Sequence, residues 1–578
     1  MEESKGPNLD VGAVEEELVS KKLSKEERRK AREKRRDEFT IPTRMTRYLW
    51  FVLLFANIVS FFDGWGSIAI MLAMSGFGET NILRAFQQIG NPDLFTYFGV
   101  SNSPILLGII LSIAGTGVVL AVSFKYLVDK YGRRPLTLIT AVGFIIFAVL
   151  TSIAPPGPGG LVFFLIVRLV ANYFLSGDIV VIIIAEEAPD HLRGRLIGIV
   201  LAMSSFGGVA CGVIQTMKIR APIPNPWGFD FAWGSTMTVW QSLYFLNIIG
   251  FVFIIPLFFL LKETKRFNAI KKYEDWRKKK GLKAKVGWFT PLQKKYARPM
   301  ILGCLAGFLL QLVYFAQVTF FGLYFAKELK MSQELIGIVT VPIVGTAGLG
   351  AFLAGPLLDR WGRLRTVRIF SYVTFAGGTL FSFPAVFVLG DISNPFLQTL
   401  VVIGAMIGVF GLIIVSAGGM IIPLEMIPTH IRSTAMGWVS AITRGAIILA
   451  PFLMMYGAEA ESAGGLSLTY QYMFVLQFIS FLTAVFTIYV LAPESKGRTL
   501  EEIVSTEVYT KKEEIRDKKY KQKYHLYLIS ICVFIGLGFL YAQTTNGTLP
   551  NVAYMVGFYS LLSIIAFLLI YYVREKVM

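Results

Sequence analysis

The sequence predicts an all-α protein that crosses a membrane many times, and three observations support this fold class. Hydrophobic residues make up 54% of the 578 residues and charged residues 16%, whereas a soluble chain carries about a quarter charged residues. The mean hydropathy is +0.59. The apolar residues also gather in runs of about 20, the length that a helix needs to cross the hydrocarbon layer. Lipid is therefore the expected solvent for most of the chain.

Fourteen such runs follow one another, and each is expected to be one transmembrane helix. The first 47 residues are polar and lack the apolar core of a secretory signal, so we expect insertion to start at the first helix. The expected spans are 48–75, 103–128, 135–154, 160–185, 194–217, 240–262, 299–326, 334–357, 366–390, 397–423, 434–457, 470–492, 524–543 and 551–573.

The basic residues support this count independently of hydropathy. Thirteen Lys and Arg precede the first span, fourteen lie from Lys262 to Arg298, and nine from Lys496 to Lys523. An even number of helices separates these blocks, so all three lie on one side, and the positive-inside rule predicts that both termini are cytoplasmic at the cell membrane. The net charge of +18 is thus explained by topology, and no nucleic-acid partner is expected.

The same blocks divide the chain into segments. We expect a basic cytoplasmic segment at 1–47, two bundles of six helices at 48–262 and 299–503, and a cytoplasmic linker between them at 263–298. A second cytoplasmic linker is expected at 504–523, and 524–578 contains the two additional transmembrane helices.

Two charged elements occur twice, at equivalent places in the two bundles. Asp129-Lys130-Tyr131-Gly132-Arg133-Arg134 follows the second span, and Gly355-Pro356-Leu357-Leu358-Asp359-Arg360-Trp361-Gly362-Arg363 follows the eighth. Glu186-Glu187-Ala188-Pro189-Asp190-His191-Leu192-Arg193-Gly194 follows the fourth span, and Glu425-Met426-Ile427-Pro428-Thr429-His430-Ile431-Arg432-Ser433 follows the tenth.

These elements resemble the signatures of the major facilitator superfamily, most of all its sugar-porter and metabolite/proton symporter branches. Pro493-Glu494-Ser495-Lys496-Gly497-Arg498-Thr499-Leu500-Glu501-Glu502-Ile503 resembles the sugar-porter tail, and Lys262-Glu263-Thr264-Lys265-Arg266 is its weaker counterpart. The resemblance covers about residues 48–503. It implies two pseudo-symmetric six-helix bundles that rock about a midplane site to give alternating access. The last two spans lie outside this twelve-helix pattern.

The resemblance also implies that the repeated elements act as a gating latch of charge-assisted pairs when the inward side is closed. The alternative is that some of these arginines only anchor the topology, but anchoring would require no acidic partners. The expected gating residues are Asp129, Arg133, Glu186, Arg193, Asp359, Arg363, Glu425 and Arg432.

Ionisable residues at hydrocarbon depth are costly, so each is a candidate functional residue. Asp63, near the middle of the first span, is the best candidate for a proton carrier, and Arg168 in the fourth span is its expected partner or regulator. Two alternatives remain for Arg168: a static ion pair with Asp63, or contact with an anionic substrate. Arg444 in the eleventh span resembles a segment of the organic-ion branch and is a candidate for substrate binding.

Polar neutral residues on the seventh span are the other substrate-binding candidates. Gln311, Tyr314 and Gln317 lie at helical spacing near one face. Sugar porters are similar in using amides on this helix to bind hydroxyl groups. We therefore expect these three residues to contact the solute.

The sequence accordingly predicts a secondary transporter of a small polar solute, a sugar or an organic or inorganic anion, working by proton symport. Its expected partners are the solute, protons and the lipid bilayer. No catalytic arrangement, metal-ligand spacing or cofactor motif is present, so neither an enzyme nor a cofactor is expected. The alternatives are a proton-coupled exporter of organic solutes, and a sensor that binds solute without moving it.

Overall fold

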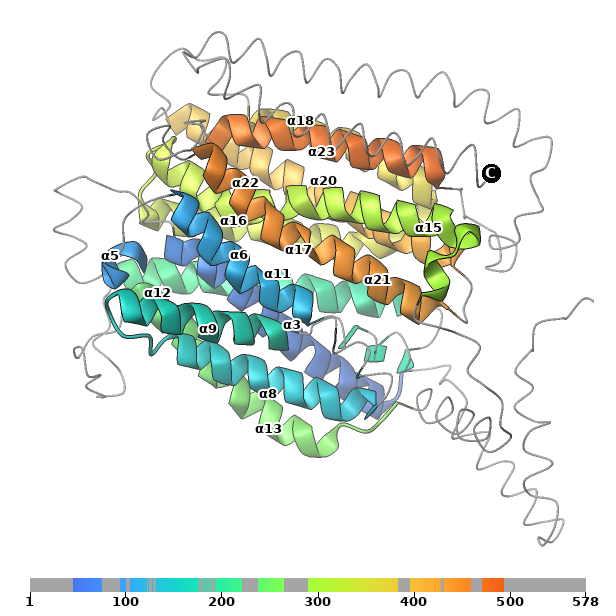
Figure 1. Ribbon diagram of the computed structural model, residues 1–578, viewed down its shortest axis with the longest axis horizontal. Helices are drawn as coiled ribbons and strands as arrows, with labels where there is room; N and C mark the ends of the chain where they lie inside the picture. Colours follow the sequence, from blue (N-terminus) through green and yellow to red (C-terminus); the bar gives the residue numbers. More distant parts are fainter. Residues whose placement is uncertain are drawn as a thin grey trace, which may run out of the picture.

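The computed structural model describes fifteen stretches of the chain, and every regular element in them is helical (Figure 1). The described residues are 45–74, 94–99, 104–121, 123, 127, 131–175, 180–181, 183–184, 187–188, 193–220, 238–264, 289–382, 395–427, 431–458 and 470–492. The first twelve expected spans fall on helices within these stretches. The spans expected at 524–543 and 551–573 lie outside them.

The N-terminal half contains six long helical segments and one short helix. The short helix, α5 (Leu94–Phe98), lies between the first two segments. The six segments are α3 (Arg47–Met74), α6 (Pro104–Leu120), α8 (Arg133–Thr151), α9 (Pro158–Phe174), α11 (Arg193–Arg220), and α12 (Val239–Phe245) continued by η1 (Leu246–Ile248) and α13 (Ile249–Leu260).

The C-terminal half repeats this arrangement after two short 3₁₀ turns, η2 (Thr290–Leu292) and η3 (Lys294–Tyr296). Its segments are α15 (Ala297–Ile301) with the π-helical turn η4 (Leu302–Ala306) and α16 (Gly307–Lys327), then α17 (Gln333–Trp361), α18 (Arg363–Ser382), α20 (Pro395–Met426), α21 (Arg432–Arg444) with α22 (Ala446–Ala458), and α23 (Tyr470–Leu491). The eleventh span, expected as one helix, is one continuous helical stretch from Thr434 to Ala458, with a local irregularity at Gly445 where α21 meets α22.

Length and composition agree with a membrane-spanning fold. Seven helical stretches in the described part are long and apolar enough to cross a bilayer, and shorter apolar helices account for further segments. Large apolar side chains such as Trp50, Ile166 and Val252 are exposed on the outer surface. In a bilayer such exposure has no cost, because lipid chains are as apolar as these side chains.

The glycine of each charged loop has a positive φ, so the sequence repeat extends to the backbone conformation at this position. Gly132 precedes α8 with a φ of +114°, and Gly362 precedes α18 with a φ of +98°. Glycine populates this region without the Cβ clash that other residues meet. Each glycine therefore turns the chain sharply into the helix that follows it.

Each half is also tied together at its first and last helices. The Tyr48 hydroxyl donates to the Lys262 carbonyl at 3.2 Å and accepts from the Lys262 N–H at 3.0 Å. In the other half, Arg298 Nε donates to the Leu491 carbonyl at 2.8 Å. These contacts lie at one end of the bundle, where α3 begins and α13 ends, which we call the linker end.

The halves meet chiefly along two helix pairs in which small residues allow close approach, and α3 and α16 make a smaller third contact. Figure 1 shows α8, α9 and α13 on one side of the molecule, α18 and α23 on the other, and α6, α11 and α17 between them. A Cβ on Gly108 of α6 would lie 2.8 Å from Met455 Cβ, and one on Gly115 would lie 2.9 Å from Ile447 Cγ2, both on α22. Helices α11 and α17 form the second pair. Small residues at such interfaces are the usual device for packing helices in lipid.

Candidate functional site

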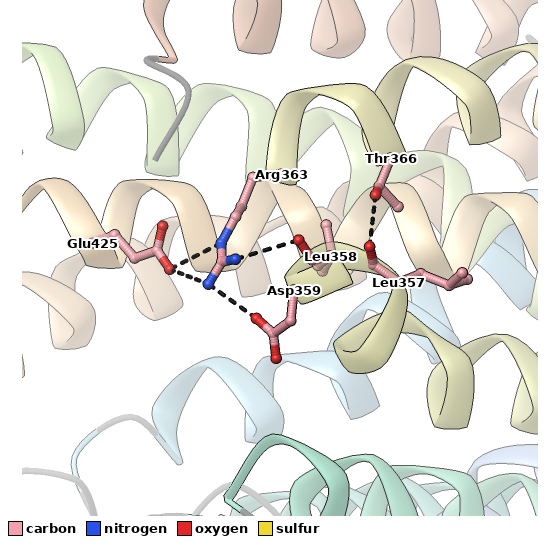
Figure 2. A network of polar contacts seen from close by, with 6 residues as sticks. All are labelled: Leu357, Leu358, Asp359, Arg363, Thr366 and Glu425. Atoms are coloured by element: carbon pink, nitrogen blue, oxygen red, sulfur yellow. Dashed lines mark hydrogen bonds and ion pairs between the residues drawn. The ribbon is translucent and has the colours of Figure 1, made fainter. Parts of the chain in front are cut away.

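Arg363 is the centre of a polar network at the linker end of the C-terminal half (Figure 2). Its Nε and Nη2 donate to Glu425 Oε1 at 3.2 and 3.0 Å, and Nη2 also lies 3.0 Å from Asp359 Oδ1. Its Nη1 donates to the Leu358 carbonyl at 3.3 Å. One guanidinium thus joins the end of α17, the start of α18 and the end of α20.

The geometry of this network follows from the helix ends that meet there. The last carbonyl groups of α17 have no partner within their own helix, so Leu358 is free to accept from Arg363. The Thr366 hydroxyl donates to the Leu357 carbonyl at 3.0 Å and satisfies a second such group (Figure 2). A cation at a helix C-terminus also interacts favourably with the helix dipole. Three of the eight expected gating residues, Asp359, Arg363 and Glu425, are therefore in direct contact.

The N-terminal half holds its copy of the loop with a different residue. Glu263, just after α13, accepts from the backbone N–H of Arg133 at 2.9 Å and of Arg134 at 3.1 Å. A carboxylate at a helix N-terminus satisfies unpaired N–H groups and complements the positive end of the dipole. Arg193 begins α11 and Arg432 begins α21, whereas Asp129 and Glu186 lie outside the described residues.

Asp63 lies in the interior of α3 and is half-buried. Its neighbour Gly64 packs directly against the backbone carbonyl of Ser204 on α11, which leaves no room for a side chain there. The Ser67 hydroxyl donates to the Asp63 carbonyl at 2.9 Å. The carboxyl group thus stands on a helix that is held tightly against α11.

Arg168 is the most deeply buried cation among the described residues. It is 2% exposed, its Nη2 donates to Asn172 Oδ1 at 3.2 Å, and its Cζ lies 4.9 Å from the centre of the Tyr244 ring. Asn172 in turn donates to the Ala114 carbonyl at 2.8 Å. Nε and Nη1 of Arg168 are buried and have no hydrogen-bond partner in the described part of the chain.

Asp63 and Arg168 lie at matching depths in two segments of the same half. Asp63 is eleven residues before Met74, where α3 ends, and Arg168 is ten residues after Pro158, where α9 begins. At 1.5 Å per residue these positions are about 16 and 15 Å from the same end of the bundle. In this structure Arg168 contacts Asn172 and Tyr244, so an ion pair with Asp63 stays a prediction for another state of the cycle.

The three residues of the seventh segment that are predicted to contact solute differ in burial. Gln311 and Tyr314 are half-buried. Gln317 is 5% exposed and points into a small, mainly apolar pocket that α16 shares with α17, α18 and α20. Ile343, Gly378 and Gly404 also line this pocket.

Arg444 contacts the opposite half of the molecule. It ends α21, directly before the local irregularity at Gly445, and its Nη1 donates to the Val118 carbonyl on α6 at 3.2 Å. Close by, the Ser112 hydroxyl of α6 donates to the Ile448 carbonyl of α22 at 2.8 Å. The residue predicted as a substrate contact is therefore also part of the interface between the two halves.

Three residues that contribute to these sites were not predicted from the sequence. In the sequence Glu263 belongs only to the weaker counterpart of the sugar-porter tail, and nothing local marks Trp65 or Tyr244 among 9 tryptophans and 24 tyrosines. Trp65 donates its indole N–H to the Leu243 carbonyl at 2.7 Å. The sequence does contain one relevant signal: an arginine at hydrocarbon depth is costly, so other helices are expected to supply partners for it.

Comparison with known proteins gives a consistent picture. The profile of the family described as sugar (and other) transporter matches residues 52–506. The arabinose-proton symporter of Bacillus subtilis (strain 168) is 24% identical over 432 residues, which cover 70% of this chain and 87% of that protein. A probable 4-methylmuconolactone transporter of Cupriavidus pinatubonensis is 22% identical over 392 residues, covering 66% and 80%.

Solved structures with the same fold include the xylose transporter XylE from E. coli. A structure of this proton:xylose symporter, bound to 6-bromo-6-deoxy-D-glucose, superposes with a TM-score of 0.56 at 18% identity and covers 79% of this chain and 98% of that chain. A partially occluded inward open conformation gives the same TM-score over 78% and 100%. This likeness shows the major facilitator fold.

Proposed function

Because the chain belongs to the sugar (and other) transporter family, it is a multi-pass secondary transporter of small solutes and not an enzyme, and we propose that it imports its solute together with protons. The solute class that we propose is a small polar molecule, a sugar or an organic or inorganic anion. Alternating access of the two halves about a site near the midplane would move it.

The observation that carries this proposal is the pair of opposite charges within hydrocarbon depth of one half. Arg168 is buried with two guanidinium nitrogens that lack hydrogen-bond partners among the described residues, and Asp63 lies at a similar depth on α3. An unpaired buried cation is costly, and an anionic group that approaches it relieves that cost. An ionised Asp63 is such a group, whereas a protonated Asp63 is not.

This difference supplies a coupling mechanism. We propose that Asp63 takes up a proton when the cavity faces the outside, which keeps it apart from Arg168, and that loss of the proton inside lets the two groups attract each other. Proton binding then changes which arrangement of α3 and α9 is stable. A ligand can shift a conformational equilibrium only through such a difference in interaction free energy between the two states.

Gln311, Tyr314, Gln317 and Arg444 are the proposed substrate contacts. Amide, hydroxyl and guanidinium groups match the hydroxyl or anionic groups of a polar solute. Gln311 and Tyr314 are the better placed of these, because they are only half-buried. Replacing Gln311 with Leu is expected to raise KM more than it lowers kcat.

The test is uptake into proteoliposomes with and without an imposed pH gradient. The solute panel is L-arabinose, D-xylose, D-glucose, inorganic phosphate, an aromatic carboxylate and an organic cation. We expect Asp63→Asn to abolish accumulation driven by the pH gradient while counterflow exchange of the same solute continues. Glu334→Gln on α17 is the matched control, because it removes a carboxylate outside this site.

Three outcomes would contradict the proposal. Equal loss of accumulation and counterflow in Asp63→Asn would show that the carboxyl is needed for movement itself and not for coupling. Solute efflux driven by an inward pH gradient would indicate an exporter. Solute binding without any flux across the panel would indicate a sensor.

A further inference from the structure

The partner that the structure gives to Arg168 is an aromatic ring on the sixth segment. Arg168 Cζ lies 4.9 Å from the centre of the Tyr244 ring, within the distance at which a guanidinium interacts with the face of an aromatic ring. Both groups are buried, Arg168 at 2% exposed and Tyr244 at 0%. Removal from water strengthens this interaction, because water no longer competes for the cation.

The ring, and not the hydroxyl, accounts for this contact. The Tyr244 hydroxyl is buried and has no hydrogen-bond partner in the described part of the chain. A buried polar atom left unpaired lowers stability, so the hydroxyl does not explain why a tyrosine stands there. The face of the ring contacts the one buried cation described on α9.

The turn of α12 that carries Tyr244 also holds the helix of Asp63. Trp65, two residues after Asp63, donates its indole N–H to the Leu243 carbonyl at 2.7 Å, and Leu243 directly precedes Tyr244. A single helical turn therefore contacts α3 beside the proposed proton carrier and α9 at the proposed partner. Two buried residues of the same segment also contact this turn. The Trp240 ring packs against the Tyr244 ring, and Asn247 Nδ2 donates to the Tyr244 carbonyl.

Among the described residues, Arg168 has one hydrogen-bond partner in addition to its contact with the ring. Its Nη2 reaches Asn172 Oδ1 one helical turn further along α9, and Asn172 is itself held by the Ala114 carbonyl on α6. Two contacts therefore hold the guanidinium, and neither is anionic. Such a cation is restrained without being neutralised, and its remaining two nitrogens are available to an anionic group.

We infer that Tyr244 is a positioning residue of the coupling site, whose ring holds the Arg168 guanidinium in place while Asp63 is protonated. This inference rests on the proposed coupling role of Asp63 and Arg168. The ring provides a weak, uncharged alternative partner for the cation. The Tyr244 ring and the Asp63 carboxylate therefore compete for the Arg168 guanidinium. Without the ring the guanidinium loses that alternative, and the coupling of proton to solute weakens.

The experiment changes the charge on the ring face at position 244 at nearly constant ring size, and a leucine variant removes the ring. Proteoliposomes containing the full chain are given an equimolar mixture of radiolabelled L-arabinose, D-xylose, D-glucose, inorganic phosphate and nicotinate. The readout is the ratio of accumulation driven by the pH gradient to counterflow exchange. The variants are Tyr244→Phe, Tyr244→Leu, and replacement of Tyr244 with mono- and trifluorinated phenylalanine, since fluorine withdraws charge from the ring face.

We expect Tyr244→Phe to keep the wild-type ratio and the fluorinated rings to lower it stepwise. Tyr244→Leu should lower the ratio on the order of tenfold with counterflow retained. Phe164→Leu is the matched control, because Phe164 is a fully buried ring on the same helix as Arg168 that contacts Phe98 and Trp240 instead of a cation. It should lower thermal stability and leave the ratio unchanged.

Several results would overturn the inference. A wild-type ratio in Tyr244→Leu, an unchanged ratio across the fluorinated series, or a Tyr244→Phe protein as defective as Tyr244→Leu would each do so. Parallel loss of accumulation and counterflow in Tyr244→Leu together with a flat fluorine series would assign the ring a packing role only. Asp63→Asn in the same assay separates the two ideas: if it uncouples and the ring variants do not, only the role of Tyr244 fails.

Discussion

Arg363 binds two carboxylates through the same nitrogen: its Nη2 lies 3.0 Å from Glu425 Oε1 and 3.0 Å from Asp359 Oδ1. The two carboxylates differ in exposure, since the side chain of Glu425 is 17% exposed and that of Asp359 is 65% exposed. Water screens an exposed ion pair much more than a buried one. Equal distances therefore correspond to unequal contributions to stability.

This asymmetry predicts that Glu425→Gln destabilises the protein more than Asp359→Asn. Loss of the shielded charged hydrogen bonds should cost about 1 to 3 kcal/mol, whereas loss of the exposed pair should cost less than about 1 kcal/mol. Thermal unfolding in detergent measures both, and a double-mutant cycle with Arg363→Gln isolates the pairwise energy. Equal destabilisation by the two substitutions would contradict the argument.

Glu263 is predicted to stabilise the start of α8 by capping the N–H groups of Arg133 and Arg134. Glu263→Gln removes the charge that complements the helix dipole and should cost about 1 kcal/mol. The melting temperature of the purified protein reports this loss. Lys294→Gln is the control, because it changes an exposed residue at the same end of the bundle, and it should leave the melting temperature unchanged. An unchanged melting temperature in Glu263→Gln would mean that the cap contributes nothing.

Gly115 is predicted to be required for α6 and α22 to close against each other. A Cβ there would lie 2.9 Å from Ile447 Cγ2, and a valine side chain has no space. Gly115→Val should lengthen the distance between one spin label on α6 and one on α22, and it should slow transport severalfold. Gly437→Val on α21 is the matched control, because a Cβ at Gly437 meets no atom within 4 Å. Unchanged label distances in Gly115→Val would argue against a tight interface here.

The charge pattern predicts that the N-terminus and the segment around Trp276 lie on the same side of the membrane. Thirteen basic residues precede α3 and fourteen lie between Lys262 and Arg298, so both segments are expected to be cytoplasmic. Reporter tags placed at residue 1 and near Trp276 measure their sides directly. Tags on opposite faces would rule out an even number of helices between them and with it the two six-helix bundles.

The membrane-spanning fold was predictable because the position of each span depends on the summed hydropathy of consecutive residues. Transfer of about 20 consecutive residues into hydrocarbon is decided by those residues alone, so the twelve segments from α3 to α23 could be located from the sequence. The repeated turn was also predictable, because Gly132 and Gly362 are the residues that tolerate a positive φ. The charged residues Asp359, Arg363 and Glu425 were expected to pair because the repeated elements resemble those of the major facilitator superfamily.

What the sequence determined is thus a set of apolar helices joined by duplicated charged turns, since these properties come from neighbouring residues. The tertiary structure decided which side chains meet: Arg168 with the ring of Tyr244, Glu263 with the start of α8, and Arg444 with the opposite half. It also placed Gln317 at a small pocket that α16 shares with α17, α18 and α20. The reason is that packing between helices distant in sequence depends on rotation and depth, which hydropathy does not encode.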